Sequence, residues 1–169
     1  DMRDLAGGSL ANGYVYTLGG RRAGFYYTNA VYLLNEGSET WDARASMPTQ
    51  LAGFATASIE NDLYVVGGLT GYGGHTNAYR FNGLSWTNVG ALPLQTYDLS
   101  AAVLYSNVYA IGGRTSYSAI RTNVYRYNGT NWTEVAGLPT GIYGHASATL
   151  NDQIYTIGGY KGSYMTNVY

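Results

Sequence analysis

The sequence predicts an all-β protein built from four tandem units of antiparallel strands, the last unit incomplete. Three markers recur with one period along the 169 residues. Double glycines begin at 19, 67, 112 and 158, tryptophans fall at 41, 86 and 132, and prolines fall at 48, 93 and 139. The intervals are 45 to 48 residues in every case. Such self-similarity is the signature of a repeat architecture, so the repeat defines the fold.

Each unit opens with two strands joined by a tight turn. Four gap-free segments that end at the double glycine align with one another, for example "TQLAGFATASIENDLYVVGG" and "TGIYGHASATLNDQIYTIGG". A run of small and apolar residues precedes a turn such as Asn12-Gly13 or Asn61-Asp62. Asn-Gly between alternating hydrophobic residues predicts a hairpin, because both central turn residues must tolerate positive φ.

The second half of each unit supplies two more strands. The stretch "TNVYRYN" at 122–128 alternates with period two, and "NWTEVAGLP" at 131–139 carries Trp132 and ends at a proline, where a strand must stop. The turns between them are "NGT" at 128–130 and "NGL" at 82–84. No window shows an apolar stripe of period 3.6, so we expect almost no helix.

Four antiparallel strands in each unit of about 45 residues predict the blades of a β-propeller. The expected blades cover 1–48, 49–93, 94–139 and 140–169. The fourth stops within its third strand and lacks the outer one, which predicts an open or partial propeller. The chain is then either part of a longer propeller or a subunit whose open edge another chain fills. The second option implies self-association by strand pairing at the open blade edge, into an oligomer or filament.

The order of the markers resembles the kelch repeat, in four copies that cover the whole chain. Each copy has a hydrophobic residue before Gly-Gly and a third-strand tyrosine, and the first three continue to Trp and then Leu-Pro or Met-Pro. The tyrosines are Tyr32, Tyr79, Tyr125 and Tyr169. The resemblance implies a kelch-type propeller. The sequence departs from the family at one position. Kelch repeats often carry an Arg sixteen residues before the first glycine, but here only the first repeat does, since that register holds Arg3, Leu51, Thr96 and Ile142. In kelch domains that bind acidic peptides this Arg faces the ligand, so recognition of an anionic peptide is disfavoured.

Composition excludes several classes of function. The net charge is −1 and the nine basic residues are scattered, whereas a nucleic-acid binder needs a cluster of them. No apolar run approaches the ~20 residues that would span a bilayer. The absence of cysteine excludes disulfides and thiolate metal sites, and with them the Tyr–Cys crosslink of kelch-like copper radical oxidases.

Catalytic residues are sparse. His75 and His145 lie at unrelated registers without a His, Asp or Glu at i+2 or i+4, so we expect ordinary hydrogen bonds, no metal site and no cofactor. Asp4 and Asp98 fall at nearby registers at the starts of first strands. A carbohydrate-active enzyme could use either with a nearby Arg, and this stays the alternative to a binding protein. Solvated turn carboxylates are the simpler interpretation.

The kelch resemblance also implies a binding face, formed by the loops after the double glycines and the starts of the first strands. The residues that map there are Arg3, Asp4, Arg21, Arg22, Tyr97, Asp98, Arg114, Tyr143 and Tyr160. Tyr and Arg are enriched at interface hot spots, although the chain's 19 tyrosines offer abundance as another explanation. We expect a non-catalytic binding or structural module for a protein or glycan. Sparse lysine and a surface rich in Asn, Thr, Tyr and Gly favour an extracellular or cell-surface location.

Overall fold

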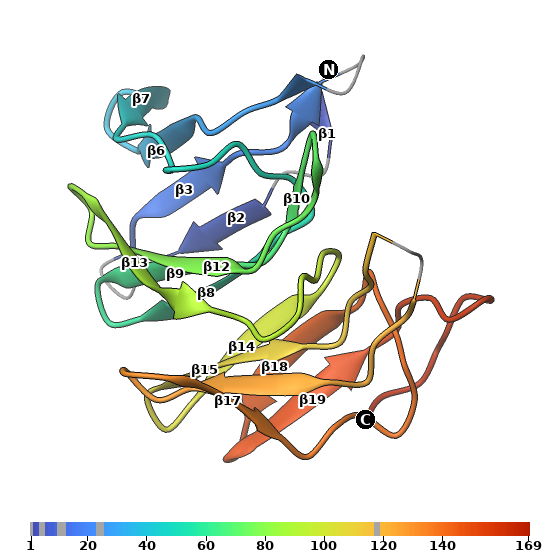
Figure 1. Ribbon diagram of the computed structural model, residues 1–169. Helices are drawn as coiled ribbons and strands as arrows, with labels where there is room; N and C mark the ends of the chain where they lie inside the picture. The colour runs from blue at the N-terminus through green and yellow to red at the C-terminus, as the bar shows by residue number, and fades with distance from the viewer. Residues whose placement is uncertain (1, 4–5, 10–12, 23–25, 117–118) are drawn as a thin grey trace.

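The computed structural model describes residues 2–3, 6–9, 13–22, 26–116 and 119–169, and all regular structure in these ranges is β-strand. Three four-stranded antiparallel sheets and a two-stranded sheet follow one another along the chain (Figure 1). Within the same ranges there is no helix of the length and apolarity needed to cross a membrane.

Each four-stranded sheet is a meander whose strands pair in chain order. Sheet I comprises β2 (Ala6–Ser9), β3 (Val15–Leu18), β6 (Val31–Asn35) and β7 (Thr40–Arg44). Sheet II comprises β8 (Ala55–Ile59), β9 (Asp62–Val66), β12 (Asn77–Phe81) and β13 (Trp86–Ala91). Sheet III comprises β14 (Ser100–Leu104), β15 (Asn107–Ile111), β16 (Val124–Tyr127) and β17 (Trp132–Val135).

Sheet IV consists of two strands, β18 (Ala146–Leu150) and β19 (Gln153–Ile157), where the sequence predicts three. The expected third strand is present only as local pairing. Ile157 forms an isolated bridge with Val168, and the backbones of Thr156 and Tyr169 exchange two hydrogen bonds of 2.9 Å. The predicted third strand of the last unit is therefore reduced to the pairing of residues 168–169 with β19.

Two small sheets lie in the loops that follow the first two double glycines. One is formed by β1 (Met2–Arg3), β4 (Arg21–Arg22) and β5 (Tyr26–Tyr27), and the other by β10 (Leu69–Thr70) and β11 (Gly73–Gly74). They extend sheets I and II beyond the double glycines.

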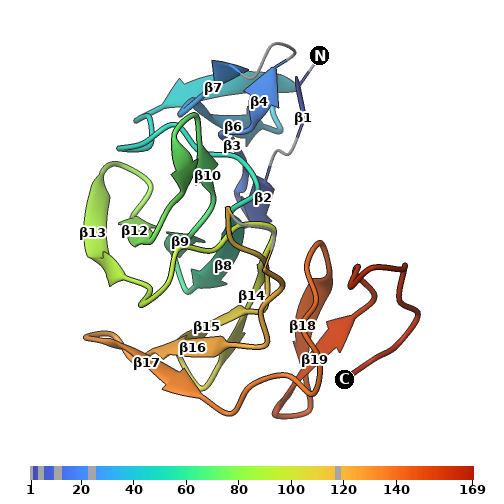
Figure 2. The same cartoon turned by 45° about the vertical axis from the view of Figure 1, so that its right-hand side comes forward.

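The first strands of the sheets lie beside one another, so the sheets follow an open arc (Figure 2). Hydroxyl groups link two of these strands. The side-chain oxygens of Ser100 and Ser147 are 2.6 Å apart, and the Thr149 hydroxyl donates to the Val103 carbonyl at 2.6 Å. Ala55 and Ala57 on β8 and Ala102 on β14 are buried, and their small side chains permit these two first strands to lie close together.

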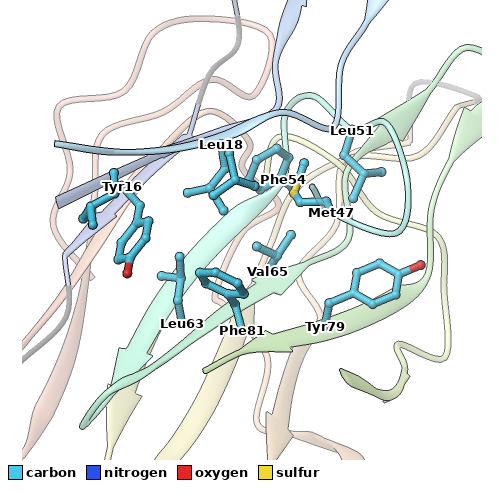
Figure 3. Packing of buried hydrophobic residues seen from close by; sticks show 11 residues of the cluster. Tyr16, Leu18, Met47, Leu51, Phe54, Leu63, Val65, Tyr79 and Phe81 are labelled. Atoms are coloured by element: carbon cyan, nitrogen blue, oxygen red, sulfur yellow. The ribbon is translucent and has the colours of Figure 1, made fainter. Parts of the chain in front are cut away.

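The hydrophobic core lies between consecutive sheets rather than within one of them. Between sheets I and II, Tyr16 meets Phe81 edge-on at 5.7 Å between ring centroids, and Trp86 stacks on Phe81 at 4.7 Å (Figure 3 shows Tyr16 and Phe81). Between sheets II and III, Tyr127 takes the place of Phe81, and the ring of Trp132 packs on it in a tilted arrangement at 5.2 Å. An aromatic pair therefore recurs in sheets II and III, and its first ring contacts a tyrosine of the preceding sheet, Tyr16 or Tyr64.

The double glycines are required where two sheets touch. Gly112 has a φ of +59°, and a Cβ on it would lie 2.7 Å from the carbonyl oxygen of Ile142 in the next repeat. The next residue, Gly113, donates its N–H to that same carbonyl at 2.8 Å. Gly68 makes the equivalent bond to Thr96. Any side chain at the first glycine would separate the backbones that these bonds join.

Candidate functional site

One end of the array brings together the two registers that the sequence predicts for a binding face. The residue that starts each first-strand segment forms an antiparallel bridge with the residue after the double glycine. The bridges are Ala52 with Leu69, Tyr97 with Arg114, and Tyr143 with Tyr160. Each bridge therefore joins the two predicted registers within one repeat.

Asp98 and Arg114 form an ion pair at the centre of this end. One carboxylate oxygen, Oδ2, accepts from Nε of Arg114 at 2.8 Å and from Nη2 at 2.7 Å. Both side chains are partly buried, with exposed fractions of 25% for Asp98 and 32% for Arg114. Burial by itself would lower the pKa of Arg114, but the charge and hydrogen bonds of Asp98 outweigh it and raise that pKa. The guanidinium is thus permanently charged and locally neutralised.

The same guanidinium lies between two tyrosine rings from different repeats. Its central carbon is 5.0 Å from the ring centroid of Tyr97 and 4.3 Å from that of Tyr143. Both distances are within the range of a cation–π interaction. Arg114 is therefore fixed on three sides, by one carboxylate and two rings.

A row of tyrosines continues outward from Arg114. The ring of Tyr143 is 5.4 Å from that of Tyr160, which is 5.4 Å from that of Tyr164. Tyr164 is 90% exposed. A surface hollow of about 380 Å³ is lined by Tyr143, Gly144, Gly159, Tyr160, Tyr164 and Met165. Tyr164 is a residue that the sequence analysis missed.

A second, smaller hollow of about 140 Å³ is lined in part by the ion pair itself. Its lining residues are Arg21, Ala52, Gly53, Leu69, Tyr97, Asp98 and Arg114. Asp98 is the one carboxylate among the described residues that line the two hollows. Arg21, in β4 beside sheet I, adds a second positive charge to the lining of this hollow.

A backbone chain of hydrogen bonds supports this end from beneath. Asp98 donates its N–H to the carbonyl of Gly53 at 2.7 Å, and Gly144 donates to the carbonyl of Asp98 at 2.8 Å. All three residues have positive φ, between +53° and +61°. They occupy one register, fourteen residues before the first glycine of each pair. Glycine recurs at this register in two repeats, and this recurrence could have indicated Gly53 and Gly144. Neither of them is among the site residues that the sequence predicts.

The remaining predicted residues do not all join this cluster. Arg22 lines a different hollow on the outer face of sheet I, with Tyr32 and Trp41, apart from the ion pair. Arg3 lies in β1 and its backbone pairs with Arg21. Asp4 lies outside the described residues.

The register that holds Arg in many kelch repeats is buried in the second, third and fourth repeats. Leu51 and Ile142 are 0% exposed and Thr96 is 3% exposed. Their carbonyls accept the N–H groups of the double glycines. These side chains face the core, so they are not available to a ligand.

Neither histidine is among the described residues that line the two hollows. His75 is half-buried and its Nε2 lies 3.2 Å from the hydroxyl of Tyr79. His145 is 8% exposed, and neither ring nitrogen makes a hydrogen bond of ordinary geometry, contrary to the sequence prediction. Its ring packs against Gly112 of the preceding repeat, which removes it from solvent. Across the part of the chain that the structure describes, no group of three metal-binding side chains converges.

No protein-family model and no curated protein matches this sequence. Among solved structures, the chain is similar to one described as "Structure of YjhT", with a TM-score of 0.84 and 13% sequence identity. The likeness covers 99% of this chain and 65% of that one, so the chain spans about two thirds of its neighbour's length. At this identity the similarity concerns the fold.

Proposed function

We propose that this chain is a kelch-type β-propeller, or a four-blade part of one, and acts as a non-catalytic binding module for a protein or glycan. The likeness to a solved structure over 99% of the chain and the repeated sheets are consistent with that architecture. The observation that carries the function is the position of Arg114 between Tyr97 and Tyr143, beside the exposed tyrosine row.

The chemistry of the site favours binding over catalysis. Asp98 already neutralises Arg114, and glycosidase chemistry needs two carboxylates about one pocket. The two hollows have one carboxylate among their described lining residues. A carbohydrate-active enzyme that uses Asp98 remains the alternative function, and it predicts turnover that Asp98→Asn abolishes.

The tyrosine row suits a ligand with both apolar faces and polar groups. Each ring offers a flat face for stacking and a hydroxyl for hydrogen bonding. Sugar rings and the side chains of an exposed peptide share this dual character. Rings that pack on one another lose little conformational freedom on binding, which favours affinity. An extracellular or cell-surface location is part of the proposal, and the sparse lysine and the abundance of Asn, Thr, Tyr and Gly support it.

Binding to a glycan array and to a displayed random-peptide library tests the function and distinguishes the two ligand classes. We expect Tyr160→Ala and Tyr164→Ala to weaken whichever interaction is found by at least about tenfold, as hot-spot truncations do. Tyr105→Ala is the matched control, since Tyr105 is 70% exposed in the turn between β14 and β15, at the opposite end of sheet III. No binding in either assay, or release of product from the glycans, would contradict the proposal.

Self-association is a second candidate role, because one specific observation favours it. Tyr32 and Trp41 on sheet I are 41% and 47% exposed, although the equivalent residues in sheets II and III pack against a preceding sheet. An oligomer or filament would cover these side chains.

A further inference from the structure

One core position recurs thirteen residues before the first glycine of each double glycine. It holds Phe54, Leu99 and His145 in the second, third and fourth repeats. The three side chains are 5%, 6% and 8% exposed. The position is therefore buried in every one of these repeats, and in the fourth it carries a titratable ring instead of a hydrocarbon side chain.

Each of these side chains packs between two repeats, against the first glycine of the preceding one. A Cβ on Gly67 would lie 3.2 Å from Cδ2 of Leu99, and a Cβ on Gly112 would lie 2.9 Å from Cε1 of His145. Phe54 makes the same contact with the first repeat, at 2.8 Å. The ring of His145 thus fills the contact between the third and fourth repeats, as Leu99 fills the one before it.

The surroundings of His145 suit the neutral ring and not the protonated one. Neither ring nitrogen makes a hydrogen bond of ordinary geometry. On the side of its own repeat the residue lies against Gly159, where a Cβ would be 2.9 Å from that of His145. Burial lowers the pKa of His145 to about 4, and the backbone of Ile111 opposes this with a smaller effect. A protonated ring is therefore more stable in water than between the two repeats.

Four other titratable side chains lie along this contact. Asp98 and Arg114 come from the third repeat and form an ion pair with each other, while Tyr143 and Tyr160 come from the fourth. None of the four is among the causes of the pKa shift of His145. Phenols carry no charge in mild acid, so Asp98 is the competing acid sensor that a test must exclude.

We propose that His145 is a pH-sensitive switch, by which mild acid opens the contact between sheets III and IV while the contacts between the earlier sheets stay closed. Protonation draws the ring into water, and the two repeats separate around it. Phe54 and Leu99 cannot take up a proton, so the equivalent contacts lack this response. The switch is thus local to one of three similar contacts.

Opening of this contact would take apart the cluster around Arg114. The guanidinium carbon of Arg114, from the third repeat, is 4.3 Å from the ring centroid of Tyr143, from the fourth. Tyr143 precedes His145 by two residues and moves with it. Release of the ligand in mild acid follows, and this consequence rests on the proposed function, whereas the opening itself does not.

Hydrogen exchange of single amides, followed by NMR in low concentrations of urea, tests the switch. Gly113 and Gly144 donate across the contact of sheets III and IV at 2.8 Å, whereas Gly68 and Asp98 donate across the contact of sheets II and III at 2.8 and 2.7 Å. Opening of one contact exposes little surface, so urea barely changes it, whereas global unfolding depends strongly on urea.

We expect Gly113 and Gly144 to exchange through a urea-insensitive opening. With a pKa of 6.5 in the open state and about 4 in the closed state, its equilibrium constant should rise about twentyfold between roughly pH 7 and pH 5, after correction for intrinsic exchange rates. The urea-insensitive opening at Gly68 and Asp98 should change by less than about twofold, because Leu99 does not titrate.

His145→Leu places the side chain of the third repeat in the fourth and should abolish the acid response at Gly113 and Gly144. His145→Phe, which copies Phe54, is the replacement if the leucine variant does not fold, as judged by circular dichroism. Asp98→Asn removes the competing carboxyl group and should keep the response.

Several results would overturn the switch. These are an acid response confined to the urea-sensitive exchange, an equal response at Gly68, a response that survives in His145→Leu, and a response that disappears in Asp98→Asn. Ligand binding at neutral pH is measured separately through Tyr160 and Tyr164, so failure of the switch is distinguishable from failure of the proposed function.

Discussion

Asp98 binds Arg114 through a single carboxylate oxygen, which accepts Nε at 2.8 Å and Nη2 at 2.7 Å. The same residue links three repeats through its backbone, because its N–H donates to Gly53 and its carbonyl accepts from Gly144. Its φ of +53° lies in the left-handed region, where Asp and Asn are the commonest residues after glycine. Asp98 therefore has two roles: its backbone joins neighbouring repeats by hydrogen bonds, and its side chain neutralises the charge of Arg114.

The first prediction separates these two roles with Asp98→Asn. Asparagine keeps the size and the tolerance of positive φ but removes the charge from beside Arg114. We expect a loss of about 1 to 2 kcal/mol in the free energy of unfolding, because the partner cation stays partly buried. Urea denaturation measures it. Asp62→Asn is the matched control, since its pair with Arg80 is 3.5 Å long and more exposed, and it should cost under about 0.5 kcal/mol. Equal losses would contradict the assignment.

The repeat could be predicted from sequence because its signals are local. Strand alternation, hairpin turns and double glycines each follow from a few neighbouring residues. The reason for the double glycine is long-range, since Gly67 lies against the carbonyl of Thr96 in the following repeat. The fixed spacing of the double glycines nonetheless makes them recognisable in the sequence, because the same close backbone contact recurs between consecutive sheets.

The site was predicted less completely, because its residues depend on how one sheet meets the next. Arg21 and Arg22 are neighbours, but successive strand residues face opposite sides, so one lines the site and the other lines the outer face of sheet I. Tyr164 lies in a loop whose length varies between repeats, so no register marks it. The burial of His145 against Gly112 likewise depends on the packing of two sheets.

The second prediction concerns the close approach at Gly112. We expect Gly112→Ala to cost more than about 3 kcal/mol, because the new Cβ adds an overlap with the Ile142 carbonyl to the strain of a positive φ. Gly129→Ala isolates the strain, since Gly129 has a φ of +93° with nothing within 4 Å of a Cβ. It should cost about 1 kcal/mol. Thermal unfolding of both variants gives the comparison, and similar losses would show that crowding is unimportant.

The third prediction compares two tryptophans at one position of the repeat. Trp86 stacks on Phe81, and its Nε1 donates to the Ala45 carbonyl of the preceding repeat at 2.8 Å. Trp86→Ala should therefore cost about 3 kcal/mol. Trp41 is 47% exposed, so Trp41→Ala should lower the free energy of unfolding by under about 1 kcal/mol when the chain is dilute. Urea denaturation at low protein concentration measures both, and a cost for Trp41 as large as that for Trp86 would be inconsistent with an exposed outer face.

The fourth prediction is a loss of stability in mild acid that depends on His145. Burial lowers the pKa of His145 from 6.5 to about 4, against a smaller opposing effect of the Ile111 backbone. The unfolded chain binds a proton below 6.5 while the folded chain does not, so the free energy of unfolding falls as the pH falls from 6.5 toward 4. The contribution is fully present above that window. We expect a loss of about 2 kcal/mol between roughly pH 7 and pH 5.

His145→Leu removes the titrating ring from the same buried position and should flatten this dependence. Leucine is tolerated there because neither ring nitrogen of His145 makes a hydrogen bond of ordinary geometry that the substitution would break. His75→Gln is the control, since His75 is only half-buried and stacks on Tyr79, so the acid-dependent loss should persist in that variant. Urea denaturation at a series of pH values gives the slopes. A wild-type slope retained in His145→Leu would assign the acid sensitivity to other groups.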